Sequence, residues 1–217
     1  MDNKYLKQNP TNKIKRIKFS RNPKQEVTID EFNKLLQSLD LTLFSEYRDY
    51  VIIQLLLDTG MRVGEYLELK EEDLDIKNKT IFISVEIAKG RKDRYVFFSN
   101  MQRTLEKWLI YKERYVRSDY IFVTNRGGKY QIHSFEKHMR NYLKKAKINK
   151  KINPHTIRNN FAKRFLMSGG DIYTLSKLLG HSSIRVTESA YLDLTTSDIR
   201  KNYLKFSPLE NMKKKNW

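Results

Sequence analysis

The chain has 217 residues, and its 39% hydrophobic content is enough for one domain with a sizeable core. Its 43 Lys and Arg residues outnumber 25 Asp and Glu residues, for a net charge of +18. A polyanionic partner is therefore the first expectation, with a merely soluble basic protein as the alternative. The absence of cysteine excludes disulfides, thiol nucleophiles and thiolate zinc sites. No apolar run approaches the ~18 residues of a membrane span and no signal-peptide core is present, so we expect a cytoplasmic protein without a membrane partner.

The first 26 residues are polar and rich in Lys and Asn, which is typical of a basic linker or arm. The ordered domain is expected to begin with a capping box, in which Thr28 pairs with Glu31 ahead of apolar residues at helical spacing. A second helix is predicted from about 45 to 57. Gly60 then supplies a left-handed helix end.

The segment 74–99 changes character. Residues 80–85 and 94–98 are rich in β-branched and aromatic side chains, and the turn sequences 77–79 and 89–92 separate the strands. This pattern predicts a small antiparallel sheet within a mostly helical α+β fold. We expect three strands.

Apolar spacing predicts further helices around 105–111 and 135–143, with a short strand at 120–123 between them. Asn153 and Asp171 are N-cap candidates for two later helices. A last amphipathic helix is expected to end near Phe206, so that the domain spans residues 27–206. Residues 207–217 form a basic tail that looks frayed.

Two arginines have the properties that phosphodiester chemistry requires. A phosphodiester under attack gathers negative charge on its oxygens, and the planar, permanently charged guanidinium groups of Arg62 and Arg158 can bind two oxygens at once. His155 precedes Arg158 by three residues and shares its helix face, although an isolated pair is as often a solvated surface feature. Glu65, three residues after Arg62, can orient its guanidinium or form a plain surface salt bridge.

Other candidates are weaker when each is taken alone. His181 can donate a hydrogen bond to a phosphate, or simply belong to a helix end. Tyr191 is a candidate nucleophile that needs cationic neighbours, because an ordinary tyrosine with a pKa near ~10 reacts poorly at neutral pH. Lys89 lies in the predicted turn 89–92, from which its ammonium group can protonate a leaving oxygen. The alternative for Lys89 is a non-specific contact with a phosphate. For its neighbours Arg91, Lys92 and Arg94, we expect such DNA contacts as their main role.

Taken in order, these residues resemble a known family, the tyrosine recombinases or phage integrase family. The resemblance covers about residues 25–205. It rests on Thr59-Gly60-Met61-Arg62-Val63-Gly64-Glu65, Lys89 in a β-turn, His155-Thr156-Ile157-Arg158-Asn159-Asn160-Phe161-Ala162, Leu178-Leu179-Gly180-His181-Ser182-Ser183, and Tyr191.

The resemblance implies site-specific recombination of double-stranded DNA through a 3′-phosphotyrosyl intermediate. Tyr191 would attack a phosphate held by Arg62, His155, Arg158 and His181, Lys89 would protonate the 5′-oxygen, and Glu65 would support Arg62. Neither a metal nor a nucleotide cofactor is implied. By the same resemblance, the segment after Tyr191 would dock on a neighbouring subunit to form a tetramer on DNA. Folding back on its own core is the alternative.

Two local departures from the family pattern are visible. Asn159 stands where many members have His, and Tyr191 follows His181 by ten residues, one more than the commonest spacing. Members usually carry an N-terminal helical domain that clamps DNA, so we expect this chain to be a fragment with residues 1–26 as the linker.

Two other classes of function remain as alternatives. One is a non-catalytic DNA-binding protein that reads DNA with a helix-turn-helix at 171–191. This alternative gives no reason for the positions of Arg62 and Lys89. The other is a metal-dependent nuclease, which is disfavoured because the four histidines form no ligand cluster with carboxylates at metal spacing.

Overall fold

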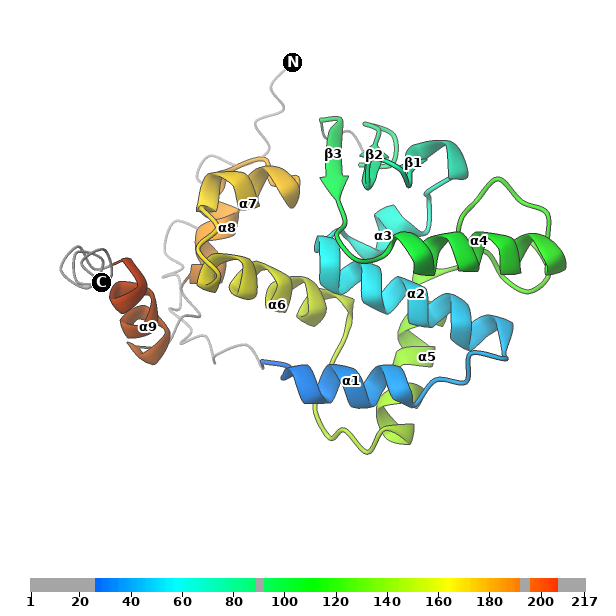
Figure 1. The fold of residues 1–217 in the computed structure, drawn as a ribbon, viewed down its shortest axis with the longest axis horizontal. Helices are drawn as coiled ribbons and strands as arrows, with labels where there is room; N and C mark the ends of the chain where they lie inside the picture. Colours follow the sequence, from blue (N-terminus) through cyan, green and yellow to red (C-terminus); the bar gives the residue numbers. More distant parts are fainter. Residues whose placement is uncertain (1–25, 89–91, 192–195, 207–217) are drawn as a thin grey trace, which may run out of the picture.

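The computed structural model describes residues 26–88, 92–191 and 196–206, and these form a mostly helical fold with one small sheet (Figure 1). Except for Glu26, the expected arm 1–26 and tail 207–217 lie outside the described residues. The described helices are α1 Ile29–Gln37, α2 Phe44–Thr59, α3 Val63–Tyr66, the short 3-10 turn Glu71–Asp73, α4 Gln102–Tyr115, α5 Ile132–Lys145, α6 Pro154–Met167, α7 Ile172–Leu178, α8 Ile184–Tyr191 and α9 Thr196–Phe206.

The sheet has three antiparallel strands in the order β1 Leu74–Asp75, β2 Thr80–Ile83 and β3 Arg94–Phe97, as the sequence predicts. β2 and β3 pair from Thr80 opposite Phe97 to Ile83 opposite Arg94. Arg94 is thus the first residue of β3, on the far side of the β2–β3 connection that contains Lys89.

The strand expected at 120–123 is not formed. Only two isolated bridges occur there, Tyr120 with Lys70 and Val123 with Lys129. Residues 121–123 are all buried, and the N–H of Ile121 donates to the carbonyl of Leu69 at 2.9 Å. The apolar run is therefore explained by burial in the core without a continuous partner strand.

Local capping signals place several helix ends. Thr28 and Glu31 form both bonds of the expected capping box at the start of α1. The side chains of Asn153 and Asp171 accept from backbone N–H groups at the starts of α6 and α7. Gly60 ends α2 with φ at 62°, a conformation that favours glycine.

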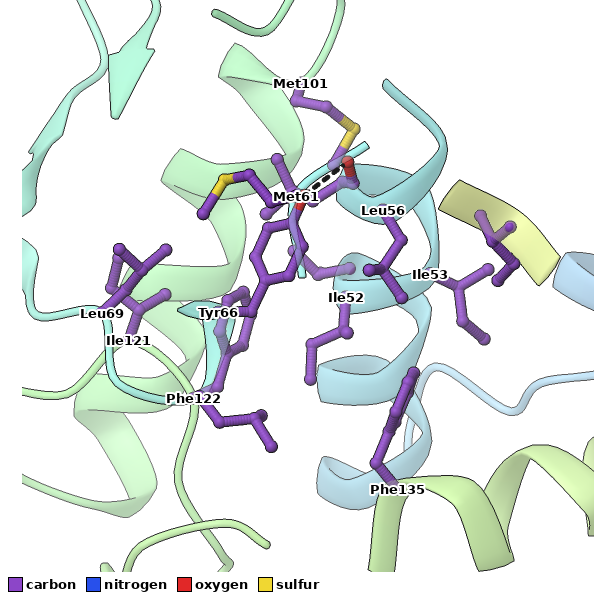
Figure 2. Close-up of a cluster of buried hydrophobic side chains, with 14 of the residues drawn as sticks. Ile52, Ile53, Leu56, Met61, Tyr66, Leu69, Met101, Ile121, Phe122 and Phe135 are labelled. Atoms are coloured by element: carbon purple, nitrogen blue, oxygen red, sulfur yellow. Dashed lines mark hydrogen bonds between the residues drawn. The ribbon is translucent and has the colours of Figure 1, made fainter. Parts of the chain in front are cut away.

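The helix α2 runs through the centre of the core, between α4 and α6 (Figure 1). Its residues Ile52, Ile53 and Leu56 are fully buried, and Figure 2 shows them among aromatic side chains that include Tyr66 and Phe135. Each such side chain contributes roughly 1.5–3 kcal/mol when fully buried. The packing of α6 along α2 brings the start of α6 next to the loop that leaves α2.

Candidate active site

Arg62 and Arg158 come from different elements and meet at the end of α2. Arg62 is the N-cap residue of α3, just after the left-handed turn at Gly60. Arg158 lies in the second turn of α6 and is buried, with 7% of its surface exposed. Its Nη1 donates to the carbonyl of Gly60 at 2.7 Å, which ties α6 to the α2–α3 loop.

The C-terminal end of α7 is the second structural element of the site. A helix leaves its last carbonyl groups without intrahelical partners and with partial negative charge. Three consecutive carbonyls there each accept a hydrogen bond from a different arginine: Leu178 from Arg94 at 3.2 Å, Leu179 from Arg158 at 2.7 Å, and Gly180 from Arg62 at 3.2 Å. The end of α7 thus gathers guanidinium groups from β3, α6 and the α3 cap.

Gly180 makes this approach possible. Its φ is +60°, and a Cβ atom at this position would lie 2.8 Å from the guanidinium carbon of Arg94. A larger residue would therefore be strained in its backbone and would displace Arg94.

Glu65 is buried between two of these arginines. Its carboxylate contacts Arg94 Nη2 at 2.7 Å and Arg62 Nη1 at 3.0 Å, and it also accepts from the backbone N–H of Arg62 at 2.9 Å. Burial acts to raise the pKa of Glu65, but the hydrogen bond and charge of Arg94, with smaller contributions from Arg62, outweigh it and the pKa lies below its usual value. Glu65 is therefore ionised at neutral pH and holds two guanidinium groups in place.

His181 follows the end of α7 directly and bonds through both ring nitrogens. Its Nε2 lies 3.0 Å from Arg158 Nη2, and its Nδ1 lies 2.8 Å from the hydroxyl of Thr187 on α8. Because arginine only donates, Nε2 must be the acceptor, so a neutral His181 carries its proton on Nδ1. The imidazole thus connects Arg158 with the helix that ends at Tyr191.

Arg62, His155, Arg158 and His181 line one hollow of about 340 Å³. The remaining lining residues are Met61, Val63, Pro154 and Ser182. Burial lowers the pKa of Arg158 to about 9, and the nearby charge of Arg62 acts in the same direction. Arg158 nevertheless stays charged at neutral pH, so the hollow has the character of an anion-binding site.

Several predicted site residues cannot be placed in this hollow. Lys89 and Arg91 lie outside the described residues, and Tyr191 is described only as the last residue of α8, without its side chain. Lys92 is exposed, as a DNA contact would require. Arg94 differs from Lys92, because its side chain is only 9% exposed and pairs with Glu65. Its role as a DNA-binding residue stays a prediction.

Sequence reasoning missed two functional contacts in this region. The pairing of Arg94 with Glu65 spans 29 residues and carries no local signal. Thr187 was not distinguished from other polar residues near Tyr191. One available signal was Gly180, since a helix that ends at glycine offers free carbonyl groups to nearby cations.

Comparisons with known proteins identify the class. Residues 25–198 match the model of the phage integrase family. The tyrosine recombinase XerD of Staphylococcus epidermidis is 32% identical over 213 residues, which cover 94% of this chain and 70% of that protein. The tyrosine recombinase XerC of Thermodesulfovibrio yellowstonii is 30% identical and is covered to 69%. The crystal structure of the XerA recombinase superposes with a TM-score of 0.74 at 32% identity, over 87% of this chain and 67% of XerA.

The chain belongs to the phage integrase family, the tyrosine recombinases. Its fold is that of their catalytic domains, and its activity is site-specific DNA recombination. The alternative of a non-catalytic helix-turn-helix protein is not favoured. In the described part of the chain, no helix is both long and apolar enough to cross a membrane, and no three His, Cys, Asp or Glu side chains group as metal ligands would.

Proposed function

We propose that the hollow binds one phosphodiester of double-stranded DNA and that Tyr191 attacks its phosphorus. The convergence of Arg62, His155, Arg158 and His181 on a single hollow carries this proposal. Guanidinium and imidazole groups fixed in advance stabilise the charge that develops on the non-bridging oxygens, and they do so without reorganising during the reaction. The net charge of +18 supports a DNA partner, and the 26% identical XerH recombinase has been solved bound to its difH substrate.

The proposed reaction exchanges one phosphodiester bond for another. The phenolic oxygen of Tyr191 forms a bond to phosphorus while the bond from phosphorus to the 5′-oxygen breaks. Lys89 protonates the departing 5′-oxygen, and Tyr191 loses its own proton, so the overall step consumes none. The 3′-phosphotyrosyl bond retains the energy of the original linkage, and the 5′-hydroxyl of a partner strand reverses the step. No nucleotide cofactor or metal ion is needed in this scheme.

Glu65 is assigned a supporting role. The four side chains Arg62, Arg94, Arg158 and Glu65 carry a net charge of +2, so the cluster still attracts a phosphate monoanion after the carboxylate is counted. Without Glu65, the three guanidinium groups would repel one another, and Arg62 and Arg94 would lose their shared anchor. Residues 27–206 form the catalytic domain in this scheme, flanked by the arm 1–26 and the tail 207–217.

Trapping of the covalent intermediate tests the proposal. A library of duplexes with a randomised core and a single nick is incubated with the protein, denatured, and probed for protein-linked strands. We expect an adduct with the wild-type chain and its persistence in the presence of a chelator. Tyr191→Phe should abolish the adduct, whereas the matched control Tyr115→Phe on α4, where the side chain is 62% exposed, should retain it. An adduct that survives in Tyr191→Phe would show that another residue is the nucleophile.

We further propose that α9 docks on a neighbouring copy of this chain when a tetramer assembles on DNA. Ile199 and Tyr203 of α9 are 57% and 65% exposed. Asp198, near the start of α9, pairs with Lys163 of α6 at 3.0 Å, and Lys205 donates to the carbonyl of Ser168. These two contacts, to α6 and to its C-terminal cap, are polar, and the exposed side chains of Ile199 and Tyr203 are available to a partner.

The assembly on DNA tests this second proposal. Chemical cross-linking of the DNA-bound protein should give a ladder up to four copies, and Ile199→Asp should reduce it while binding of a single copy persists. Glu188→Gln, an exposed change on α8, is the control. A ladder that Ile199→Asp leaves intact would favour packing of α9 on its own chain.

A further inference from the structure

We infer that Thr187 is a positioning residue for the recombination reaction, because its hydroxyl fixes the ring of His181 and accommodates both tautomers of the imidazole. The inference rests on the proposed role of His181 at the phosphate. It begins with a contact that the phosphate-binding residues do not explain. Thr187 Oγ1 lies 2.8 Å from His181 Nδ1, on the side of the ring opposite Arg158.

The burial of Thr187 makes this contact significant. The residue is 0% exposed, so its hydroxyl is shielded from bulk water and needs a partner within the protein. His181 provides that partner. Since one ring nitrogen bonds Arg158 and the other bonds Thr187, the imidazole plane is held from two sides before any ligand arrives.

The protonation pattern explains why a hydroxyl suits this position. In the free protein, Nε2 accepts from Arg158, so Nδ1 carries the proton and donates to Thr187. When a phosphate enters, Nε2 must carry a proton to donate to a phosphate oxygen. The neutral ring then leaves Nδ1 as an acceptor. A hydroxyl can accept in the first state and donate in the second, whereas a carboxylate or an amide N–H suits only one of them.

The position of Thr187 on α8 adds a mechanical link. Tyr191 is the last residue of α8, four positions after Thr187. The bond from Thr187 to His181 therefore joins the end of α7, where the arginines gather, to the helix that carries the proposed nucleophile. Loss of the hydroxyl should disturb the ring of His181 while DNA affinity, which depends on many phosphate contacts, changes little.

The experiment compares two substitutions on the full chain. Thr187→Val replaces the hydroxyl with a methyl group of similar volume, and Thr187→Ser keeps the hydroxyl. Adduct formation on the nicked substrate should slow about tenfold in the first, the factor associated with one buried hydrogen bond, and should stay within about threefold of wild type in the second. The dissociation constant for intact DNA should change less than about twofold in both. Thr104→Val on α4, a helix that lies apart from α7 and α8 (Figure 1), is the matched control.

A double-mutant cycle separates positioning from simple stabilisation. If Thr187 acts through His181, then Thr187→Val should cost less than about twofold in a His181→Ala background. An equal loss in both backgrounds, or a loss that serine does not restore, would overturn the inference.

The tautomer of His181 gives a readout that does not depend on catalysis. Nitrogen-15 NMR of the free protein, with the signal assigned from the His181→Ala variant, should show Nδ1 protonated in the wild type. The proton on Nδ1 should be visible by proton NMR in the wild type and in Thr187→Ser, because the hydroxyl accepts from it, and it should be lost to faster exchange with water in Thr187→Val. A proton that stays equally visible in Thr187→Val would contradict the inference even if no adduct ever formed. A failure of wild-type adduct formation together with the expected loss of this proton signal would contradict only the catalytic role of the site.

Discussion

The buried carboxylate of Glu65 offers a sharp test of the arginine cluster. Glu65→Gln preserves the size of the side chain and removes its charge, so at least one of Arg62 and Arg94 would face an amide in place of a carboxylate oxygen. Breaking a buried ion pair by removing one partner costs roughly 3–5 kcal/mol. The side chains of Glu65 and Arg94 are 4% and 9% exposed, but Arg62 at 29% can recover some hydration. We therefore expect a loss near ~3 kcal/mol at pH 7.

Urea unfolding followed by circular dichroism measures this loss, and a thermal midpoint lower by about 6–12 °C should accompany it. The matched control is Glu68→Gln. Glu68 pairs with Lys129 at 2.6 Å but is 35% exposed, and such surface pairs contribute about 0–1 kcal/mol.

The pH dependence provides an independent check on the same substitution. The folded-state pKa of Glu65 lies below its ordinary value of 4.5, so its stabilising contribution is fully present above that pH. It is lost as the pH falls through the lower folded-state value. The gap in stability between the wild type and Glu65→Gln should therefore shrink in acid. A gap that is no larger than that of Glu68→Gln, or one that persists unchanged in acid, would refute the reasoning.

Three further results are expected. Gly60→Ala should lower the unfolding free energy by about 2–3 kcal/mol in a urea titration. The left-handed backbone costs ~1–2 kcal/mol for alanine, and the new methyl group would overlap the ring of Phe161. Gly128→Ala, where φ is not positive, is the control in the same titration. Asp49→Asn should cost about 3 kcal/mol by thermal unfolding, because the fully buried carboxylate accepts from Arg48 at 2.9 Å; a loss under ~1 kcal/mol would contradict this. DNA affinity should fall steeply with salt, with a log–log slope of about −0.9 for each phosphate neutralised, and a flat response in a filter-binding assay would count against a phosphate-contacting surface.

The parts of the fold that the sequence predicted are those with local causes. The cap at Thr28 pairs with a residue three positions away. Gly60 is a residue type that commonly ends helices in the left-handed conformation, so both features follow from short-range rules. The family motifs likewise predicted that Arg62, Arg158 and His181 lie together, and the three line one hollow, while their roles in the reaction stay predictions. The strand predicted at 120–123 is not formed, and the apolar residues 121–123 are instead buried in the core. Sequence periodicity alone does not distinguish such a buried segment from a strand in a sheet.

Contacts between residues that are far apart in the sequence had no such local signal. From charge alone, Arg94 and Lys92 are both predicted to contact phosphates. Only the folded structure shows that the guanidinium of Arg94, on β3, lies against Glu65. The same holds for Thr187, whose partner depends on the angle between α7 and α8. The proposed roles of Lys89 and Tyr191 stay predictions that rest on the family motifs.

The bonds between the arginines and the end of α7 also explain how the site can be rigid without being blocked. A guanidinium has five N–H groups. Within the described residues, Arg158 uses three of them, for the carbonyls of Gly60 and Leu179 and for His181 Nε2. Two remain for the phosphate that we propose the hollow binds, and in that proposal the bond to His181 is the one that the phosphate replaces. The two carbonyl bonds therefore fix the group before binding, so the entropic cost of ordering a long side chain falls on folding and not on the DNA-binding step.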